Sequence, residues 1–328
     1  MIRRRSCITL LGGAVAWPLA APAQQRPAMP LIGVLTPGSP GQIGYEAAFR
    51  TGLGEMGYAE GRNVTIEFRG AQNDLSRLPE LAADLVRRQA AVLVTGGTPA
   101  AIAAKAATTS IPIVFSLGSD PVQFGLVASL NRPGGNATGV IDMDVELVSK
   151  RLGLLQELVP HAKRFAALVN PASQIAETVN KNVQTAAAAI GRPVEIFNAA
   201  SSGDIDMAFA AMVQKRSDAI LVGPDPLFAL RRVQLISLAA RHAIPTIYPS
   251  PPRLFAEAGG LINYGSNIAE RNRQIGIYTG RILKGEKPAD LPVMRPAKFE
   301  FIINLQTAKL LGMTVPATLL ALADEVIE

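Results

Sequence analysis

Short apolar runs alternate with stretches of helical periodicity along most of the chain. The run LIGVLTPGS (31–39) predicts a buried strand that ends in turn residues, and GYEAAFRTGLGEMGY (44–58) carries apolar residues at helical spacing up to Gly57. Further strands are predicted in NVTIEFRGA, AAVLVTGG and IPIVFSLGSDP. Helical patterns of about 10–15 residues separate these strands, which is typical of βαβ units and of a parallel sheet.

The same order of elements starts again near residue 164. RFAALVNPASQ (164–174) has the pattern of LIGVLTPGS, and SDAILVGPDPLFALRR (217–232) has the pattern of QAAVLVTGGTPAAIAAK (89–105). The matched positions, at a nearly constant offset, are Val34 and Leu168, Val64 and Val194, Val94 and Val222, and Pro112 and Pro245. Four matched elements in one order predict an α/β fold of two Rossmann-like lobes in tandem, each built on a parallel sheet.

The chain after Tyr248 is too short for a third domain. It predicts a strand in GGLINYG, a helix over Asn267 to Lys284, a strand in FEFIINL and a terminal helical stretch. These elements would complete the two lobes, so the backbone crosses between the lobes more than once, and LKGEKPADLPV (283–293) is predicted to be one crossing. Lobe 1 is accordingly expected over 30–142 plus about 267–290, and lobe 2 over 143–266 plus about 291–328.

The first 23 residues have the features of an export signal. Arg3, Arg4 and Arg5 precede the apolar stretch ITLLGGAVAWPLA, and Ala21-Pro22-Ala23 offers a cleavage site. The paired arginines suit a twin-arginine signal, but Cys7 stands where such signals carry an aromatic residue or leucine, so Sec export stays open. The apolar stretch is too short to span a membrane. We expect a periplasmic protein whose exported form lacks cysteine, disulfides and Cys-based metal sites.

Composition narrows the class of protein further. Of 328 residues, 48% are hydrophobic and 18% are charged, which is enough to bury a full core and argues against disorder. The formal net charge of +6 includes the three arginines of the signal. No basic run with interleaved aromatic residues remains after them, so nucleic acid is not an expected partner.

The loops after the predicted strands carry the candidate chemistry. In open parallel sheets, ligands bind beyond the carboxyl ends of the strands. The loops there are TPGS (36–39), TGGTP (95–99), SLGSDP (116–121), NPASQ (170–174), GPDP (223–226) and YPSPP (248–252). They offer hydroxyl groups and backbone N–H groups at helix N-termini, which attract a carboxylate or a small anion. None of them is a P-loop or a G-x-G-x-x-G motif.

The stretch SDPVQFGLVASLNRPGGNATGV (119–140) joins several of these signals. SDP is predicted to face a ligand, VQFGLVASL (122–130) to form a helix, and NRPGGNATGV (131–140) to be the turn that leads toward the second lobe. Gly134 and Gly135 would allow that bend.

Catalysis has little support in the sequence. His161 and His242 stand at predicted helix ends, and neither G-x-S-x-G nor H-E-x-x-H occurs. Asp120, Asp142 and Asp225 lie near strand ends, but an acid that faces a pocket pairs with an ammonium group as readily as it acts as a base. We therefore expect a binding protein that is not an enzyme and that uses neither a cofactor nor a metal.

Several longer motifs resemble the ABC transporter substrate-binding family of the tryptophan/tyrosine transport type, within the type I periplasmic-binding fold. They include PIVFSLGSDPVQFGLVASLNRPGGNATGV, GTPAAIAAKAATTSIPIVF, KRLGLLQELVP, LFAEAGGLINYG, RILKGEKPADLPV and KFEFIINLQTAKLLGMTVP. The similarity extends over the full length. It implies two lobes joined by a hinge of several crossings, with a cleft that closes on a small ligand.

The resemblance also implies roles for particular residues. Thr98 and nearby amides, including that of Gly97, would bind a ligand carboxylate, and Ser116 and Asp120 would bind its ammonium group. The second lobe would contribute Asn170, Ser173 and Asp225. The remaining candidates for ligand contact are Thr36, Ser39, Tyr45, Tyr248 and Tyr264, with Phe124 as a further aromatic residue.

The expected function is that of a monomeric periplasmic solute-binding protein of an ABC importer. It would bind an amino acid or related small carboxylate, and the resemblance implies an aromatic amino acid. It would deliver the ligand to a membrane permease after closure of the cleft. An exported sensor module that presents ligand to a membrane receptor is the alternative, since the same fold serves both purposes.

Overall fold

The computed structural model describes residues 29–39, 45–142, 144–295 and 298–328. Its first sheet has five parallel strands in the order β2-β1-β3-β4-β5. The strands are β1 (Leu31–Thr36), β2 (Thr65–Gly70), β3 (Val92–Gly96), β4 (Ile113–Leu117) and β5 (Ala137–Ile141). The parallel sheet and the predicted strands of the first half are thus confirmed, and β5 is an additional strand.

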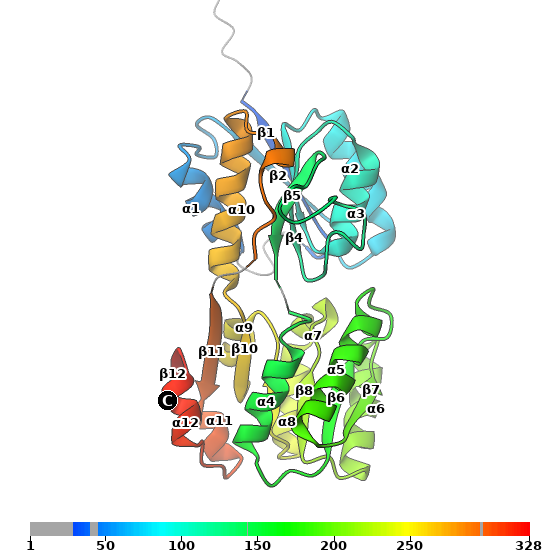
Figure 1. Cartoon of the computed structure of the whole chain (residues 1–328), viewed down its shortest axis with the longest axis vertical. Coiled ribbons are helices and arrows are strands. Elements are labelled where there is room, and N and C mark those ends of the chain that lie inside the picture. The colour runs from blue at the N-terminus through cyan, green and yellow to red at the C-terminus, as the bar shows by residue number, and fades with distance from the viewer. Residues whose placement is uncertain (1–28, 40–44, 143, 296–297) are drawn as a thin grey trace, which may run out of the picture.

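Helices cover both faces of this sheet, because alternate side chains of each strand point to opposite faces. The helices α2 (Leu78–Arg87) and α3 (Thr98–Ala107) pack on the face that includes Leu35 and Phe115. The helices α1 (Tyr45–Glu55) and α10 (Ile268–Leu283) pack on the face that includes Val34. We call this sheet and its helices the first unit (upper half of Figure 1).

The second sheet has seven strands in the order β12-β11-β10-β9-β8-β6-β7. They are β6 (Phe165–Val169), β7 (Val194–Asn198), β8 (Ala219–Val222), β9 (Thr246–Tyr248), β10 (Ile262–Ser266), β11 (Phe299–Asn304) and β12 (Glu325–Ile327). All neighbours are parallel except β10 and β11, which are antiparallel, so the predicted parallel sheet is confirmed apart from this one pair. The reason is connectivity: β10 leaves the sheet toward α10, and β11 re-enters the sheet from that same end.

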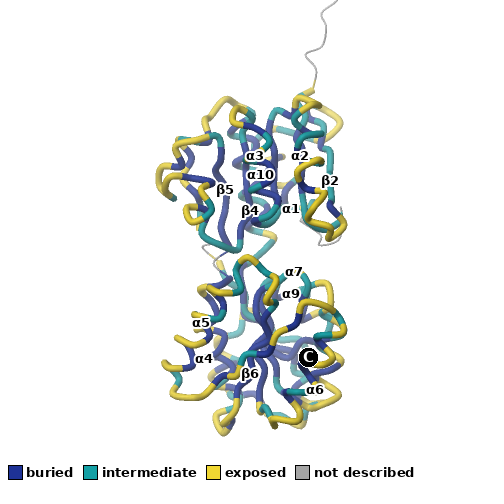
Figure 2. Tube along the Cα trace, turned by 90° about the vertical axis from the view of Figure 1, so that its right-hand side faces the viewer, coloured by how far each residue is buried: buried dark blue, intermediate teal, exposed yellow. Residues whose placement is uncertain are grey.

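The second sheet also lies between two layers of helices. One layer contains α4 (Val148–Leu158), α5 (Ala176–Ile190), α11 (Leu305–Leu310) and α12 (Ala317–Leu322). The other contains α6 (Ser202–Gln214), α7 (Pro226–Leu230), α8 (Arg232–Arg241) and α9 (Pro252–Glu257). We call this sheet and its helices the second unit. Figure 2 shows buried strands inside each unit and exposed residues on the outer turns. No helix in the described part of the chain is long and apolar enough to cross a membrane.

The chain passes between the units after β5, after β10 and before β11 (Figure 1). The segment Leu283 to Val293 was predicted to be a crossing, and this prediction is wrong. It stays on the first unit, where Thr138 Oγ1 donates to Leu291 O (2.6 Å) and Val293 N donates to Leu130 O (2.7 Å). Leu291 and Val293 are apolar and are buried in the cores of that unit. The lobe boundaries given above stay a prediction.

The stretch between β4 and β5 also differs from the prediction. Residues 122–130 form a series of turns and not a helix, with Gly125 in a left-handed conformation (φ 65°). Leu126 N donates to Pro121 O (3.0 Å), and the side chains of Leu126 and Val127 are buried in the core. Turn geometry at a glycine thus prevails over the apolar spacing. The turn after Leu130 leads into β5 of the same sheet before the chain leaves for the second unit.

Close contact between α1 and α10 fixes α10 on the first unit. A Cβ atom at Gly52 would lie 1.9 Å from Arg273 O, and a Cβ atom at Gly276 would lie 2.2 Å from Phe49 O. Only glycine permits this approach of the two helix backbones. Because α10 follows β10 directly, the second sheet is connected to the first unit through a firmly packed helix.

Candidate functional site

The carboxyl ends of the parallel strands of both sheets point toward the middle of the molecule. β5 leads from the first sheet into the second unit, and its parallel neighbours end on the same side. β10 leads from the second sheet into α10, and β6, β8 and β9 run in the same direction as β10. The helices α7 and α9, which follow β8 and β9, accordingly lie on the side of the second unit that faces the first (Figure 1).

The loops after β3 and β4 of the first sheet are bound to each other. Gly97 N donates to Ser116 O over 2.8 Å, and Thr98 Oγ1 and Ser119 Oγ share a hydrogen bond of 2.8 Å. Thr98 and Ser116 are buried. Three residues implicated from the sequence, Gly97, Thr98 and Ser116, therefore lie together, and Ser119 joins them.

The N-terminus of α3 is the anion-attracting feature of this loop pair. Its N-cap is Gly97, with φ 83°, and no side chain caps the helix. The partial positive charge of a helix N-terminus favours a carboxylate or a small anion there. Asp120 lies after β4, where its Oδ1 accepts a hydrogen bond from Val122 N (2.9 Å).

The loop after β1 borders the same group. Thr36 Oγ1 donates to Gly38 O at 3.4 Å, and Pro37 lies beside Gly97. Ser39 is half-buried. Tyr45 is the first residue of α1, and its side chain is outside the described part of the structure.

The second sheet assembles its own polar cluster from the loops after β6 and β8. Asp225 Oδ1 accepts hydrogen bonds from Asn170 Nδ2 (3.0 Å) and from Leu227 N (2.9 Å), the latter as N-cap of α7. Burial raises the pKa of Asp225, while the hydrogen bonds from Asn170, Leu227 and Ser173 act in the opposite direction. The structure thus brings together the three second-lobe residues named from the sequence: Asn170, Ser173 and Asp225.

Two aromatic candidates pack with hydrophobic cores: Tyr248 is buried in one, and the half-buried Tyr264 packs against the other. Tyr248 is 1% exposed, and its ring stacks on Phe255 with the ring centroids 5.1 Å apart. Burial raises the pKa of its hydroxyl group. Tyr264 packs against Phe299 and Phe301, with centroid distances of 6.1 Å to each. Side chains of a strand alternate between faces, and both tyrosines point into helix layers. Ligand contact by the buried ring of Tyr248 is therefore not retained, and ligand contact by the half-buried Tyr264 stays a prediction.

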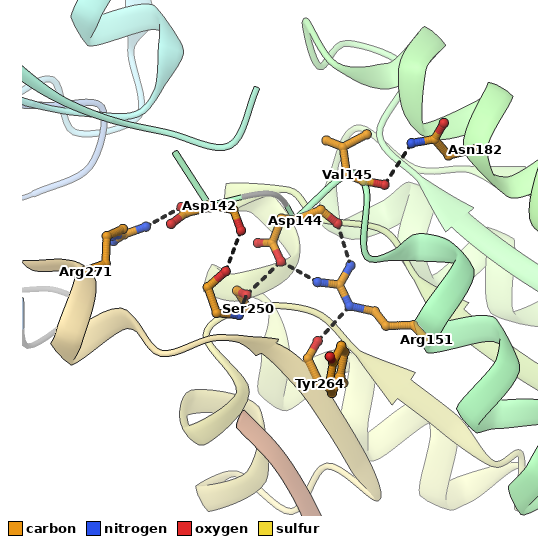
Figure 3. Close-up of polar contacts among 9 residues, drawn as sticks. Asp142, Asp144, Val145, Arg151, Asn182, Ser250, Tyr264 and Arg271 are labelled. Atoms are coloured by element: carbon orange, nitrogen blue, oxygen red, sulfur yellow. Dashed lines mark hydrogen bonds and ion pairs between the residues drawn. The ribbon is translucent and has the colours of Figure 1, made fainter. Parts of the chain in front are cut away.

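A buried polar network at the linkers was missed by sequence reasoning. Arg151 of α4 is fully buried, and its guanidinium donates to the carboxylate of Asp144, to Asp144 O (3.0 Å) and to Tyr264 O (2.7 Å) (Figure 3). Ser250 Oγ donates to Asp144 Oδ1 (2.7 Å) and accepts from Ser266 N (2.8 Å). The linker after β5 is thereby fixed to three elements of the second unit.

Asp142 connects this linker to the first unit and to β10. Its carboxylate pairs with Arg271 of α10 through Oδ2, and its main-chain oxygen accepts from Ser266 Oγ (Figure 3). Its N–H donates to Leu117 O of β4 (2.6 Å). The position of Asp142 at a strand end was a signal in the sequence, but its partner Arg271 lies 129 positions away, where no local pattern reveals it.

Other parts of the described chain offer no competing centre. No group of three or more His, Cys, Asp or Glu side chains could hold a metal ion within the described residues. A hollow of about 380 Å³ is lined by Leu158, Val159, Pro160, His161, Ala162 and Asp218. The hollow lies at the end of α4 and at the start of β8. It is therefore beside the amino ends of the strands of the second sheet, whereas the polar loops follow the carboxyl ends.

Comparison with known proteins points to one family. A family model described as ABC transporter substrate binding protein matches residues 39–327. A curated protein of Clostridioides difficile, named as a tyrosine-binding protein, is 29% identical over 265 residues, which is 81% of this chain and 75% of that protein.

Two solved structures share the fold over 91% of this chain and 99% of their own. An ABC domain from Streptococcus pneumonia in complex with L-Trp is 30% identical, with a TM-score of 0.82. A substrate-binding protein with adhesive properties from Clostridium difficile, in a ligand-free, open structure, is 27% identical, with a TM-score of 0.68. At similar identity, the present arrangement is thus closer to the complex with L-Trp.

Proposed function

The chain belongs to the family of ABC transporter substrate-binding proteins, and from this premise we propose that it binds an aromatic amino acid between its two units. Members of this family bind solutes and perform no bond chemistry, so the chain is not an enzyme. The finer assignment is supported by the relatives, one named for tyrosine and one solved with L-Trp.

The observation that carries the proposal is the pair of polar clusters at facing strand ends. The first unit offers the uncapped N-terminus of α3 with Thr98 and Ser119, which suits a carboxylate. Asp120 on the first unit and Asp225 on the second unit are the acids beside these loops, and they suit an ammonium group. An amino acid carries both groups on one carbon atom, so it can contact both units at once.

Contacts from both units would make ligand binding and closure a single event. A ligand shifts a conformational equilibrium only by its differential affinity for the two states, and an amino acid held by both clusters has that difference. We assign the present arrangement to the closed side of this equilibrium, because it superposes better on the complex with L-Trp than on the ligand-free, open relative.

The cellular setting is part of the same proposal. Residues 1–23, interpreted as an export signal, lie outside the described residues. We place the chain in the periplasm after export, as a monomer that hands its ligand to the permease of an ABC importer. We propose that the two units are the two predicted lobes and that they approach each other when the cleft between them closes.

Titration calorimetry with L-tyrosine and L-tryptophan tests the ligand assignment. Asp120→Asn and Asp225→Asn each remove a charge but keep an oxygen for the backbone N–H that the acid now accepts, and asparagine is also a good N-cap. Each variant should bind at least about tenfold more weakly, since a hydrogen bond to a charged group contributes about 1.5–3 kcal/mol.

Asp290→Asn is the matched control, because Asp290 is exposed on the first unit, away from the strand ends. Its affinity should equal that of the parent. Unchanged affinity in both Asp120→Asn and Asp225→Asn would show that these acids do not bind the ammonium group of the ligand. Failure of the parent to bind any of the standard amino acids would remove the ligand class.

A further inference from the structure

Asp142 is held by both units at the base of the linkers. Its N–H and its carboxylate are bound by Leu117 and Arg271 of the first unit, and its main-chain oxygen is bound by Ser266 at the end of β10. Asp144 lies two residues after Asp142. Among the described residues, its carboxylate contacts groups of the second unit, the guanidinium of Arg151 and the hydroxyl of Ser250. A rotation of one unit against the other must therefore change the surroundings of Asp142.

The carboxylate of Asp142 is buried, and only one of its two oxygen atoms has a partner among the described residues. The residue is 8% exposed, and Oδ1 has no hydrogen-bond partner among the described residues. The buried Nδ2 of Asn272, next to Arg271 on α10, is also without a partner there. A buried acceptor without a donor is costly, and the cost is larger for a charged group. Burial accordingly raises the pKa of Asp142 to about 6, although the neighbouring Arg271 acts to lower it.

The charged groups around Asp142 come from three elements. Arg271 on α10 pairs with it, and Asp144 on the linker raises its pKa further. Arg151 on α4 reaches it only through Asp144, which takes up that positive charge. Ser266, which donates to the main-chain oxygen of Asp142 from the second unit, is uncharged. Desolvation by the closely placed units is thus the largest influence on this carboxylate.

We propose that Asp142 is a proton-sensitive positioning residue of the hinge, so that closure takes up a proton and ligand binds more tightly in mildly acidic medium. This inference rests on the proposed function. Opening moves Ser266 and Asp144 away from Asp142 and admits water to the carboxylate, which favours its charged form. Closure removes that water and favours the protonated form. A group whose proton affinity is higher in the closed state makes closure more favourable as the pH falls.

The first test measures the affinity for L-tryptophan by calorimetry at pH 7.5 and pH 5.0. The ligand itself does not titrate in this range, because its carboxyl group ionises below the range and its amino group above it. The parent should bind about three- to tenfold more tightly at pH 5.0, as expected for a pKa difference of about one unit between the states. Asp142→Asn, a neutral isostere, should lose this gain and bind no more tightly at pH 5.0 than at pH 7.5.

Two controls assign the effect to this residue. Asp290→Asn, and the double variant His161→Gln with His242→Gln, should retain the full pH dependence of the parent. Loss of the dependence in the histidine variant, or its persistence in Asp142→Asn, would overturn the proposal. A merely structural role of Asp142 would weaken binding at both pH values and leave the ratio unchanged.

A measurement without ligand separates this proposal from the proposed function. The radius of gyration of the ligand-free chain, from small-angle X-ray scattering, should be smaller at pH 5.0 than at pH 7.5. If neither aromatic amino acid binds, the ligand assignment fails and this measurement still decides on the hinge. If Asp142→Asn does not fold, Ser266→Ala replaces it: the carboxylate remains, so the pH dependence must persist while the radius of gyration increases. An equal radius of the parent at both pH values would refute the proposal.

Discussion

Arg151 shows how a single buried charge can organise a linker. It is the largest fully buried side chain of the described chain, and each of its three guanidinium nitrogens donates a hydrogen bond to Asp144 or to Tyr264 O. A buried ion pair gains little over an apolar pair of the same shape, but removal of one partner leaves an uncompensated charge. The role of Arg151 is therefore to fix where the linker after β5 meets the second unit.

Replacement of this arginine has a defined cost. Arg151→Met leaves Asp144 buried beside only Ser250, and the free energy of unfolding should fall by about 3–5 kcal/mol. Urea denaturation followed by circular dichroism measures this loss. Arg253→Met, which breaks the exposed pair with Glu325, should change the free energy by less than about 1 kcal/mol. If both variants lost a similar free energy of unfolding, burial of the Arg151–Asp144 pair would not explain its contribution to stability.

The same residue scale explains what the sequence could predict about the site. The loops of Thr98, Asn170 and Asp225 were identified because they follow apolar runs, and strand ends gather at one edge of a parallel sheet. The resemblance to the family then implied the roles of these three residues. Tyr248 was misplaced because a run of three to five apolar residues does not reveal which face a strand residue occupies. Arg151 and Arg271 were missed because their acid partners are fixed by tertiary structure, not by spacing along the chain.

At the scale of elements, the contact of α1 with α10 fixes the position of Arg271 and Asn272 beside the linkers. Arg271 and Asn272 are the fourth and fifth residues of α10, and Gly276 lies about one turn after Asn272, against the backbone of α1. The helix that carries the partner of Asp142 therefore cannot slide without separating from α1.

Alanine substitutions at two glycines separate this packing from helix propensity. Gly276→Ala places a Cβ atom 2.2 Å from Phe49 O, and a backbone atom cannot yield as a side chain does. The free energy of unfolding should fall by about 1–3 kcal/mol. Gly54→Ala, on the exposed side of α1 with no atom within 4 Å of its Cβ, should raise it by up to about 1 kcal/mol. Thermal denaturation of both variants measures these two changes in stability, which should have opposite signs. A more stable Gly276→Ala variant would contradict the close packing of α1 and α10.

Most helices and strands could be predicted from the sequence, but some segments between them could not. The strand and helix alternation gave the α/β class and most of the elements, because apolar periodicity is local. The turns at 122–130 were predicted to be helical because Gly125 sits inside an apolar stretch, where its left-handed conformation has no sequence signature. The course of 283–293 depended on which core buries Leu291 and Val293, which is a property of the assembled unit.

At the scale of the whole molecule, a ligand that contacts both units should stabilise the chain as one body. At a free ligand concentration of 100 times the dissociation constant, the free energy of unfolding should rise by about 2.7 kcal/mol. Thermal shift of the full chain with L-tyrosine, L-tryptophan and, for comparison, a D-enantiomer measures this rise. The D-enantiomer presents its carboxylate and ammonium group in mirror-image order, so an equal rise with both enantiomers would contradict simultaneous contact with the two clusters.

The path of the chain has a consequence for how the protein is made. One face of the first sheet, which carries Ile32, Val34 and Val92, is covered partly by Ile275, Tyr278 and Ile282 of α10. When β5 leaves the ribosome, α10 has not yet been synthesised, and at about 5–20 residues per second the interval is on the order of 10–30 s. The nascent first unit therefore spends that time with an apolar face open to chaperones.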